Sequence, residues 1–302
     1  MTHVDVRIYE VGPRDGLQNE SHPIPTDTKL RFIGLLADAG LREIEATSFV
    51  APAAIPQLAD ADELMSRLER RTGVRYPVLV PNARGLERAI AANVDAVCVF
   101  TGVSEGYVHA NLGKSIAESI AALTPVVAEA ARRGWWVRAY LSSAFGDPYD
   151  GLVADEAVVG VAAKLLELGP TIDELVISDT IGVAGPADVR RVIGALTESG
   201  IPPERLAMHF HDTRGTALAN VMTALQQGVH CFDASTGGTG GSPYAPGAGG
   251  NLATEDLVYL LDREGLRHGV DLDGVLEAAR FICQALGRPL ASKVGLAGGW
   301  PA

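Results

Sequence analysis

The chain has 302 residues, of which 47% are hydrophobic and 21% charged, so it can bury a substantial core without disulfides. Its formal net charge of −12 argues against binding to nucleic acid and to an anionic membrane surface. Three cysteines in apolar runs, an N-terminus without a secretion signal, and no apolar run near roughly 20 residues predict a cytoplasmic protein that does not cross a membrane.

Short apolar runs alternate with longer amphipathic runs along the whole chain, as strands alternate with helices. The expected strand and helix pairs, in chain order, are 4–9 and 26–39, 42–46 and 56–71, 75–80 and 83–92, 96–101 and 116–133, 136–142 and 154–168, 174–178 and 186–199, 206–211 and 216–227, and 231–235 and 255–263. A terminal helix over 271–286 follows the last pair.

Eight such pairs fit a (β/α)8 TIM barrel, which usually takes about 250 residues. Strict alternation requires parallel strands with right-handed crossovers, and nearly continuous apolar strands suit a sheet covered on both faces. The sequence therefore predicts a single TIM-barrel domain over residues 1–302 with an additional C-terminal helix. A doubly wound open sheet is the alternative.

Polar residues follow the strands at the end where barrel enzymes carry their chemistry. His209 and His211 are two residues apart in a strand and so share a face, although an isolated pair of this kind is often only structural. The ends of the seventh, eighth and first strands are neighbours in a closed barrel, which brings Asp15 and Asn251 to the same place. Two imidazoles with oxygen ligands and room for water favour Mg²⁺ or Mn²⁺ over a structural zinc.

Arg14 stands beside the expected ligand Asp15. Its guanidinium keeps its charge, so it can stabilise oxygen charge that develops in a reaction; a surface salt bridge is the plainer alternative. Glu45 and Asp179, at the ends of the second and sixth strands, are candidates for tuning ligands or moving protons, or are purely structural carboxylates.

A glycine-rich loop, GGTGGSPYAPGAGG over 237–250, follows the eighth strand and leads into Asn251. It is not a Walker loop, because no Gly-Lys-Ser/Thr follows. Its seven glycines allow close approach to a ligand, so a mobile active-site loop is favoured over a merely flexible connection.

Six segments carry a family resemblance over nearly the whole chain. They are VGPRDGLQNE (11–20), SFVAPAAIPQLAD (48–60), SDTIG (178–182), HFHDTRGTALAN (209–220), GGSPYAPGAGGNLATEDLVYLL (240–261) and FICQALGR (281–288). Together they resemble the 3-hydroxy-3-methylglutaryl-CoA lyase family, which belongs to the metal-dependent lyases and condensing enzymes built on a (β/α)8 barrel.

The resemblance implies a role for each candidate residue. The metal ligands would be Asp15, His209, His211 and Asn251, and the catalytic arginine would be Arg14. Gln18, Glu45 and Asp179 would support substrate, metal or proton movement. The family also suggests a homodimer or higher homo-oligomer.

The implied reaction is a retro-Claisen cleavage of an acyl-CoA substrate. A divalent cation binds the tertiary hydroxyl, a base removes its proton, and the carbon–carbon bond breaks. Acetyl-CoA forms through its enolate, whose oxygen Arg14 would stabilise, and acetoacetate leaves. Either Asp15 or His209 can relay the first proton.

One position departs from the family, which usually carries a cysteine in the glycine-rich loop where this chain has Ser242. A thiol with a pKa of about 8.5 can transfer a proton near neutrality, whereas an alkanol hydroxyl needs a strong base. The substitution leaves open a related substrate such as citramalyl-CoA, or a barrel that binds without turnover. A condensing enzyme of the isopropylmalate or citramalate synthase type is disfavoured by HFHDT in place of HxHND and by the short C-terminal region.

Overall fold

The computed structural model describes residues 5–169, 171–241 and 250–299. Its main sheet has nine strands, all parallel: β1 (Arg7–Glu10), β2 (Glu43–Ile44), β3 (Thr47–Ser48), β4 (Val78–Leu79), β5 (Ala96–Gly102), β6 (Trp136–Ser142), β9 (Ile172–Asp179), β10 (Leu206–Phe210) and β11 (Cys231–Ala234). Two further strands form a small antiparallel hairpin, β7 (Gly146–Asp147) and β8 (Gly151–Leu152).

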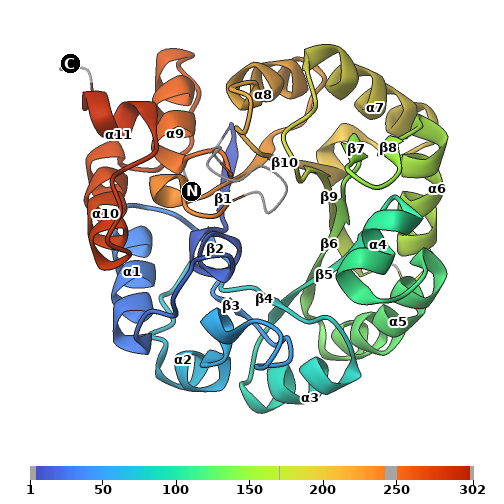
Figure 1. Ribbon diagram of the computed structural model, residues 1–302, viewed down its shortest axis with the longest axis horizontal. Helices are drawn as coiled ribbons and strands as arrows, with labels where there is room; N and C mark the ends of the chain where they lie inside the picture. Colours follow the sequence, from blue (N-terminus) through green and yellow to red (C-terminus); the bar gives the residue numbers. More distant parts are fainter. Residues whose placement is uncertain (1–4, 170, 242–249, 300–302) are drawn as a thin grey trace.

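The helices form a ring outside the strands, as seen along the barrel in Figure 1. They are α1 (Thr26–Asp38), α2 (Ala61–Arg67), α3 (Ala83–Ala91), α4 (Glu105–Leu112), α5 (Ile116–Arg133), α6 (Asp155–Leu166), α7 (Pro186–Glu198), α8 (Ala217–Gln226), α9 (Thr254–Arg263), α10 (Leu272–Ala285) and α11 (Lys293–Ala297). Four short helical turns lie between them: η1 (Gly12–Gly16), η2 (Pro56–Leu58), η3 (Pro203–Arg205) and η4 (Thr236–Gly238).

The barrel is closed by its second strand, which is divided into β2 and β3. β2 pairs with β1 through Tyr9 and Glu43, and β3 pairs with β4 through Thr47 and Val78. The sheet order β2-β1-β11-β10-β9-β6-β5-β4-β3 therefore begins and ends in the same stretch of chain. The predicted TIM barrel is confirmed, and the open doubly wound sheet is excluded.

Apolar side chains pack in two places. The larger core fills the space between the sheet and the surrounding helices. A smaller cluster lies inside the barrel and includes Tyr9, Cys98, Tyr140 and Val176. Charged residues share this interior, since Arg138 is fully buried among these strands.

Several predicted element boundaries differ from those in the structure. The helix expected over 56–71 is a short 3-10 turn that begins at Pro56, followed by a helix that ends when the chain becomes extended at Leu68. The strand expected over 42–46 is interrupted between β2 and β3. The predicted start of the first strand, at residue 4, lies outside the described residues.

Helix α4 was not predicted. Its sequence, EGYVHANL, has no apolar stripe at helical spacing, so periodicity gives no signal for it. Its ends do carry local signals, because the Ser104 side chain accepts a hydrogen bond from the Tyr107 amide and Gly113 adopts a left-handed φ of 63°. This helix lies against β5 and α5 and reaches the barrel mouth.

The C-terminal segment packs on the start of α9. Glu255 accepts hydrogen bonds from the Gly237 amide and the Ser292 hydroxyl. Asp256 accepts from the Lys293 and Val294 amides, 3.1 and 2.7 Å away. The predicted terminal helix is present as α10. A second short helix, α11, was not predicted, and these contacts hold it against α9.

Stability is expected to fall with rising pH because of Glu255. Burial raises the pKa of Glu255 from 4.5 to about 7. The folded chain therefore holds this proton where the unfolded chain has released it, and the stabilisation present below pH 4.5 is lost as pH rises through about 7. Between pH 5 and 8, Glu255→Gln should remove about 2–3 kcal/mol of this pH dependence from the free energy of unfolding.

The measurement is denaturant unfolding at about pH 5 and about pH 8, monitored by circular dichroism. Glu198→Gln, at an exposed position at the end of α7, is the control and should keep the wild-type slope. An unchanged slope in Glu255→Gln would contradict the assignment.

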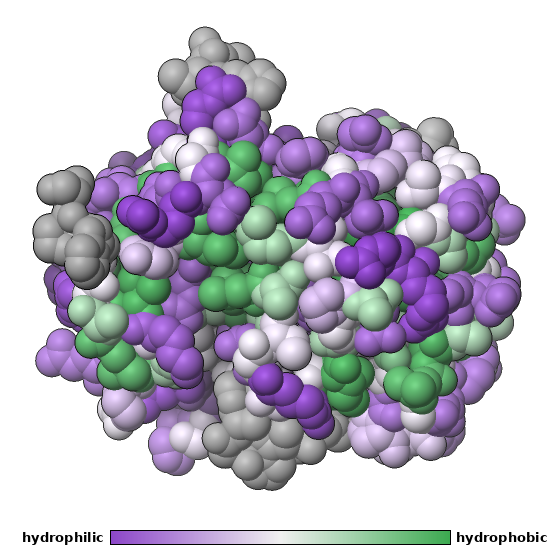
Figure 2. All heavy atoms as spheres, turned by 90° about the horizontal axis from the view of Figure 1, so that it is seen from above, coloured by the Kyte–Doolittle hydropathy of each residue, from purple (hydrophilic) through white to green (hydrophobic). Residues whose placement is uncertain are grey.

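The face seen in Figure 2 is largely hydrophilic. Hydrophobic residues are most frequent near its middle, and a few lie singly elsewhere on it. Within the described ranges, no helix has both the length and the apolar character needed to cross a membrane.

Candidate active site

A cavity of about 390 Å³ opens at the ends of the barrel strands. The residues that line it come from the C-terminal ends of the strands and from the loops that follow them, among them the loops after β1, β3, β4, β5, β9, β10 and β11, as the barrel architecture requires. Polar residues from the β1 and β10 loops form one side, including Arg14, Asp15 and His211. Apolar residues form another side of the lining and include Ile55, Phe100 and, from helix α4, Leu112.

The loop after β1 is held in place by the buried Glu10. Its carboxylate accepts hydrogen bonds from the Gly12 and Thr236 amides and from the Thr236 and Thr254 hydroxyls. A Cβ on Gly12 would lie 2.5 Å from Glu10 Oε1, so the turn requires glycine. This anchoring fixes the positions of the two residues that follow in the same turn, Arg14 and Asp15.

Asp15, His209 and His211 form a cluster suited to a metal ion. Their ligand atoms all lie within 4.8 Å of one another, and the two imidazole centroids are 5.2 Å apart. Asn251 belongs to this group through two contacts. Its backbone pairs with that of His211 in an isolated antiparallel β-bridge, and its side-chain amide donates to Asp15 Oδ2 at 2.8 Å. The structure thus brings together the four residues expected to bind metal.

Two buried atoms at this cluster are ready to accept a ligand. Nδ1 of His211 and Oδ1 of Asn251 have no hydrogen-bond partner among the described residues. Buried polar atoms without partners are costly, and a cation would satisfy an imidazole nitrogen and an amide oxygen together. The donor set of one carboxylate, two imidazoles and an amide oxygen fits a divalent cation.

The protonation states at neutral pH also fit a cation. Burial would raise the pKa of Asp15, but Arg14 and the two imidazoles outweigh it and lower this pKa to about 2. Burial lowers the pKa of His211 to about 3. Asp15 is therefore ionised and His211 neutral, as metal ligands must be.

Arg14 is held by two carboxylates. Its Nε donates to Glu45 Oε1 and its Nη1 to Asp15 Oδ1, both at 2.6 Å. The second oxygen of Glu45 accepts from the Tyr140 hydroxyl at 2.7 Å. Glu45 therefore orients the arginine and the tyrosine, while Arg14 itself faces the cavity.

The remaining predicted residues have different surroundings. Gln18 lines the cavity and donates to Asp15 Oδ1 at 3.0 Å. Asp179 uses both carboxylate oxygens to accept the Val183 and Ala184 amides, which stabilises the turn after β9, and it is not among the residues that line the cavity. Ser242 lies outside the described residues.

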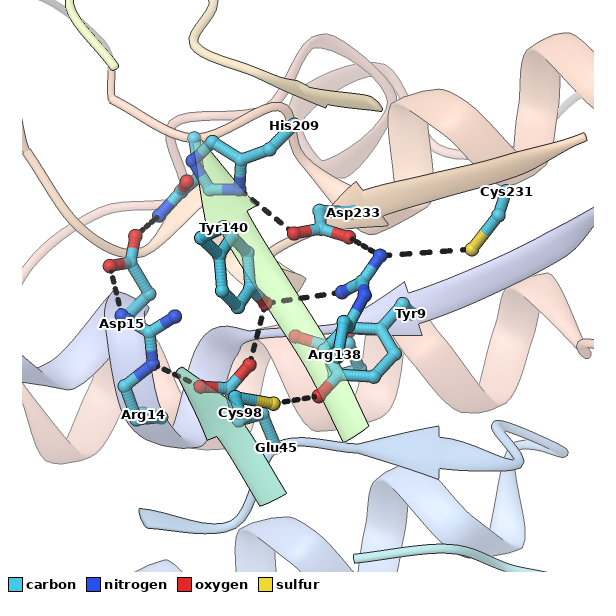
Figure 3. A network of polar contacts seen from close by, with 12 residues as sticks. Tyr9, Arg14, Asp15, Glu45, Cys98, Arg138, Tyr140, His209, Cys231 and Asp233 are labelled. Atoms are coloured by element: carbon cyan, nitrogen blue, oxygen red, sulfur yellow. Dashed lines mark hydrogen bonds and ion pairs between the residues drawn. The ribbon is translucent and has the colours of Figure 1, made fainter. Parts of the chain in front are cut away.

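Two buried residues beneath the cavity were not among the predicted site residues. Asp233 accepts from His209 Nδ1 at 3.0 Å, and Arg138 forms an ion pair with Asp233 at 2.6 Å. Figure 3 shows the resulting chain of contacts. It runs from Asp15 through Arg14 and Glu45 to the Tyr140 hydroxyl, and from there through Arg138 and Asp233 to His209. A charge inside an apolar strand, as in WVRAYLS and CFDA, is the sequence signal that identifies them.

Comparisons with known proteins agree with this geometry. A family model described as HMGL-like matches residues 5–282. The chain is 48% identical over 288 residues to hydroxymethylglutaryl-CoA lyase YngG of Bacillus subtilis, covering 95% of each chain.

Two solved structures are similar over nearly the full length. A hydroxymethylglutaryl-CoA lyase from Pseudomonas aeruginosa has a TM-score of 0.94 at 42% identity, with 97% of each chain covered. An HMG-CoA lyase from Acinetobacter baumannii, in complex with coenzyme A and 3-methylmalate, has a TM-score of 0.92 at 36% identity, with 100% of each chain covered. With this similarity in sequence and fold, the chain belongs to the HMGL-like family.

Proposed function

We propose that this chain is a divalent-metal-dependent lyase that cleaves 3-hydroxy-3-methylglutaryl-CoA to acetyl-CoA and acetoacetate. The observation that carries the proposal is the position of the Arg14 guanidinium beside the cluster of Asp15, His209 and His211 in one cavity. The relatives named as hydroxymethylglutaryl-CoA lyases support the same reaction.

Asp15, His209, His211 and Asn251 would hold the cation, Mg²⁺ or Mn²⁺. When bound, it supplies a Lewis acid that lowers the pKa of a coordinated substrate hydroxyl. Three hydrogen-bond donors orient the Asp15 carboxylate for this task, namely Arg14, Gln18 and Asn251.

Arg14 would bind the thioester oxygen of the substrate. Cleavage pushes an electron pair toward the thioester, so negative charge builds on this oxygen as the enolate of acetyl-CoA forms. The guanidinium is a fixed cation already locked in place by Glu45, so little reorganisation is needed when the charge appears. The apolar side of the cavity would receive the methyl-bearing part of the acyl chain.

The direct test is incubation of the protein with 3-hydroxy-3-methylglutaryl-CoA and either Mg²⁺ or Mn²⁺, with both products identified by mass spectrometry. Acetyl-CoA and acetoacetate should form in equal amounts, and a chelator should stop the reaction. Failure to form acetyl-CoA with any divalent cation would overturn the proposal.

A related substrate is the second candidate. The Acinetobacter baumannii relative was solved with coenzyme A and 3-methylmalate, a different hydroxy acid. A higher kcat/KM for citramalyl-CoA or 3-methylmalyl-CoA than for 3-hydroxy-3-methylglutaryl-CoA would favour this alternative.

Replacing Ser242 with cysteine is expected to raise kcat, by up to about 100-fold, because a thiol can deliver the proton that the enolate needs. Ser199→Cys, which adds a thiol at the exposed end of α7, is the control and should leave kcat unchanged. An equal or lower kcat in Ser242→Cys would assign the loop serine another role.

We further propose a cytoplasmic homodimer. The location is supported by the three cysteines, Cys98, Cys231 and Cys283, which are free and buried. The dimer is suggested by the family resemblance, and sedimentation equilibrium would test it.

A further inference from the structure

A fully buried arginine lies inside the barrel, in contact with side chains of neighbouring strands. Arg138 comes from the middle of β6 and has 0% of its surface exposed. Its Nε donates to Glu174 at 2.7 Å, its Nη2 contacts Asp233 Oδ1 at 2.6 Å, and its Nη1 donates to the Tyr140 hydroxyl at 3.1 Å. The guanidinium also lies 3.7 Å from the centre of the Tyr9 ring.

Stability alone is a poor explanation for this arrangement. Removing an arginine and two carboxylates from water carries a large desolvation penalty, and well-packed apolar residues often replace such groups without loss. Other positions of the barrel interior are filled by small or apolar residues such as Val176 and Ala207. The charges in this layer therefore call for a functional explanation.

Asp233 connects the arginine to the metal cluster. Its Oδ1 faces Arg138, and its Oδ2 accepts from Nδ1 of His209. The parallel register places His209 opposite Asp233 on adjacent strands, so β10 and β11 bring the two side chains within reach, and the rotation of the carboxylate depends on its other partner, Arg138. A carboxylate at Nδ1 keeps the hydrogen on that nitrogen and leaves the Nε2 lone pair free.

We propose that Arg138 is a positioning residue for the metal site, acting through Asp233 on the orientation and tautomer of His209. The ion pair fixes the Asp233 carboxylate, and that carboxylate fixes the imidazole. This inference rests on the proposed function only in taking His209 as a metal ligand.

The chain offers a matched control in Glu174. It binds the same guanidinium as Asp233 does, and it also pairs with Arg7, but it has no contact with His209 among the described residues. A purely structural role of the buried ions predicts similar effects from Arg138 and Glu174. A positioning role predicts that only Arg138 and Asp233 influence metal binding.

The first test uses the full-length metal-free protein, without substrate, titrated with Mn²⁺ and followed by electron paramagnetic resonance. Arg138→Met and Asp233→Asn should each weaken Mn²⁺ binding about 10- to 100-fold. The double variant should bind no more weakly than Asp233→Asn, because both changes break one linkage. Glu174→Gln should stay within about threefold of wild type, and Arg138→Lys should recover part of the affinity.

The second test reads the tautomer directly by nitrogen-15 NMR of labelled histidines in the metal-free protein. His209 should carry its hydrogen on Nδ1 in the wild type and in Glu174→Gln. It should populate the other tautomer in Arg138→Met, because the Asp233 carboxylate is then no longer held against Nδ1. If Arg138→Met does not fold, Arg138→Lys and Asp233→Asn supply the same comparison against Glu174→Gln.

Wild-type Mn²⁺ affinity in Arg138→Met, equal losses in Arg138→Met and Glu174→Gln, or additive losses in the double variant would each overturn the inference. A wild-type protein that binds Mn²⁺ but cleaves no hydroxyacyl-CoA would overturn only the proposed function. A wild-type protein that binds no Mn²⁺ would overturn both.

Discussion

Replacing Arg14 with methionine is expected to lower kcat for 3-hydroxy-3-methylglutaryl-CoA by about 100- to 1,000-fold, the usual loss when one donor to a developing oxyanion is removed. Methionine keeps much of the side-chain volume but has no positive charge. KM should change less, because charge on the thioester oxygen is greatest in the transition state. Steady-state kinetics at saturating Mn²⁺ measures both constants.

The variant also leaves Glu45 buried without its cation, and breaking a buried pair costs about 3–5 kcal/mol. The double variant Arg14→Met with Glu45→Gln removes that unpaired charge and should be as inactive as the single variant while unfolding at a higher temperature. Arg132→Met, which breaks the surface ion pair with Glu129 on α5, is the control and should keep wild-type kcat. Full activity in the double variant would exclude Arg14 from catalysis.

Replacing Asp15 with asparagine should nearly abolish metal-dependent turnover. Residues outside the ligand set already change metal affinity by about 10- to 100-fold, so losing an ionised ligand should weaken Mn²⁺ binding by more than about 100-fold. Asparagine has nearly the same shape, which isolates the effect of the charge. Mn²⁺ titration of the metal-free protein and kcat at fixed metal concentration give two independent readings.

Asp38→Asn provides the control for this change, because Asp38 is an exposed aspartate at the end of α1 that pairs with Arg71, and neither residue lines the cavity. It should bind Mn²⁺ and turn over substrate as wild type does. If Asp15→Asn retained wild-type Mn²⁺ affinity, the cation would have to bind elsewhere.

The barrel itself could be predicted because eight apolar runs, each followed by an amphipathic run, leave few other ways to bury both faces of a parallel sheet. Local irregularities could not be predicted in this way. The break between β2 and β3 and the early end of α2 at Arg67 arise from backbone geometry that residue periodicity does not report. Helix α4 has local caps at Ser104 and Gly113 but no apolar stripe.

The polar residues at the strand ends could be predicted for a similar reason. Asp15, His209 and His211 lie at or shortly after the ends of apolar strands, and closure of the barrel brings those strand ends together. Their roles remain predictions. Arg138 and Asp233 were harder to assign, because a charge within a strand shows its partner only when the register of neighbouring strands is known.

The cavity has two sides with separate origins in the chain. The chemical side comes from the loops after β1 and β10, whereas much of the apolar side comes from the loops after β3, β4 and β5 together with α4. Substitutions in α4 can therefore change the shape of the cavity without touching Asp15, His209 or His211. The volume open to a bound molecule and the cluster beside it are specified by separate stretches of the chain, so one can vary while the other is kept.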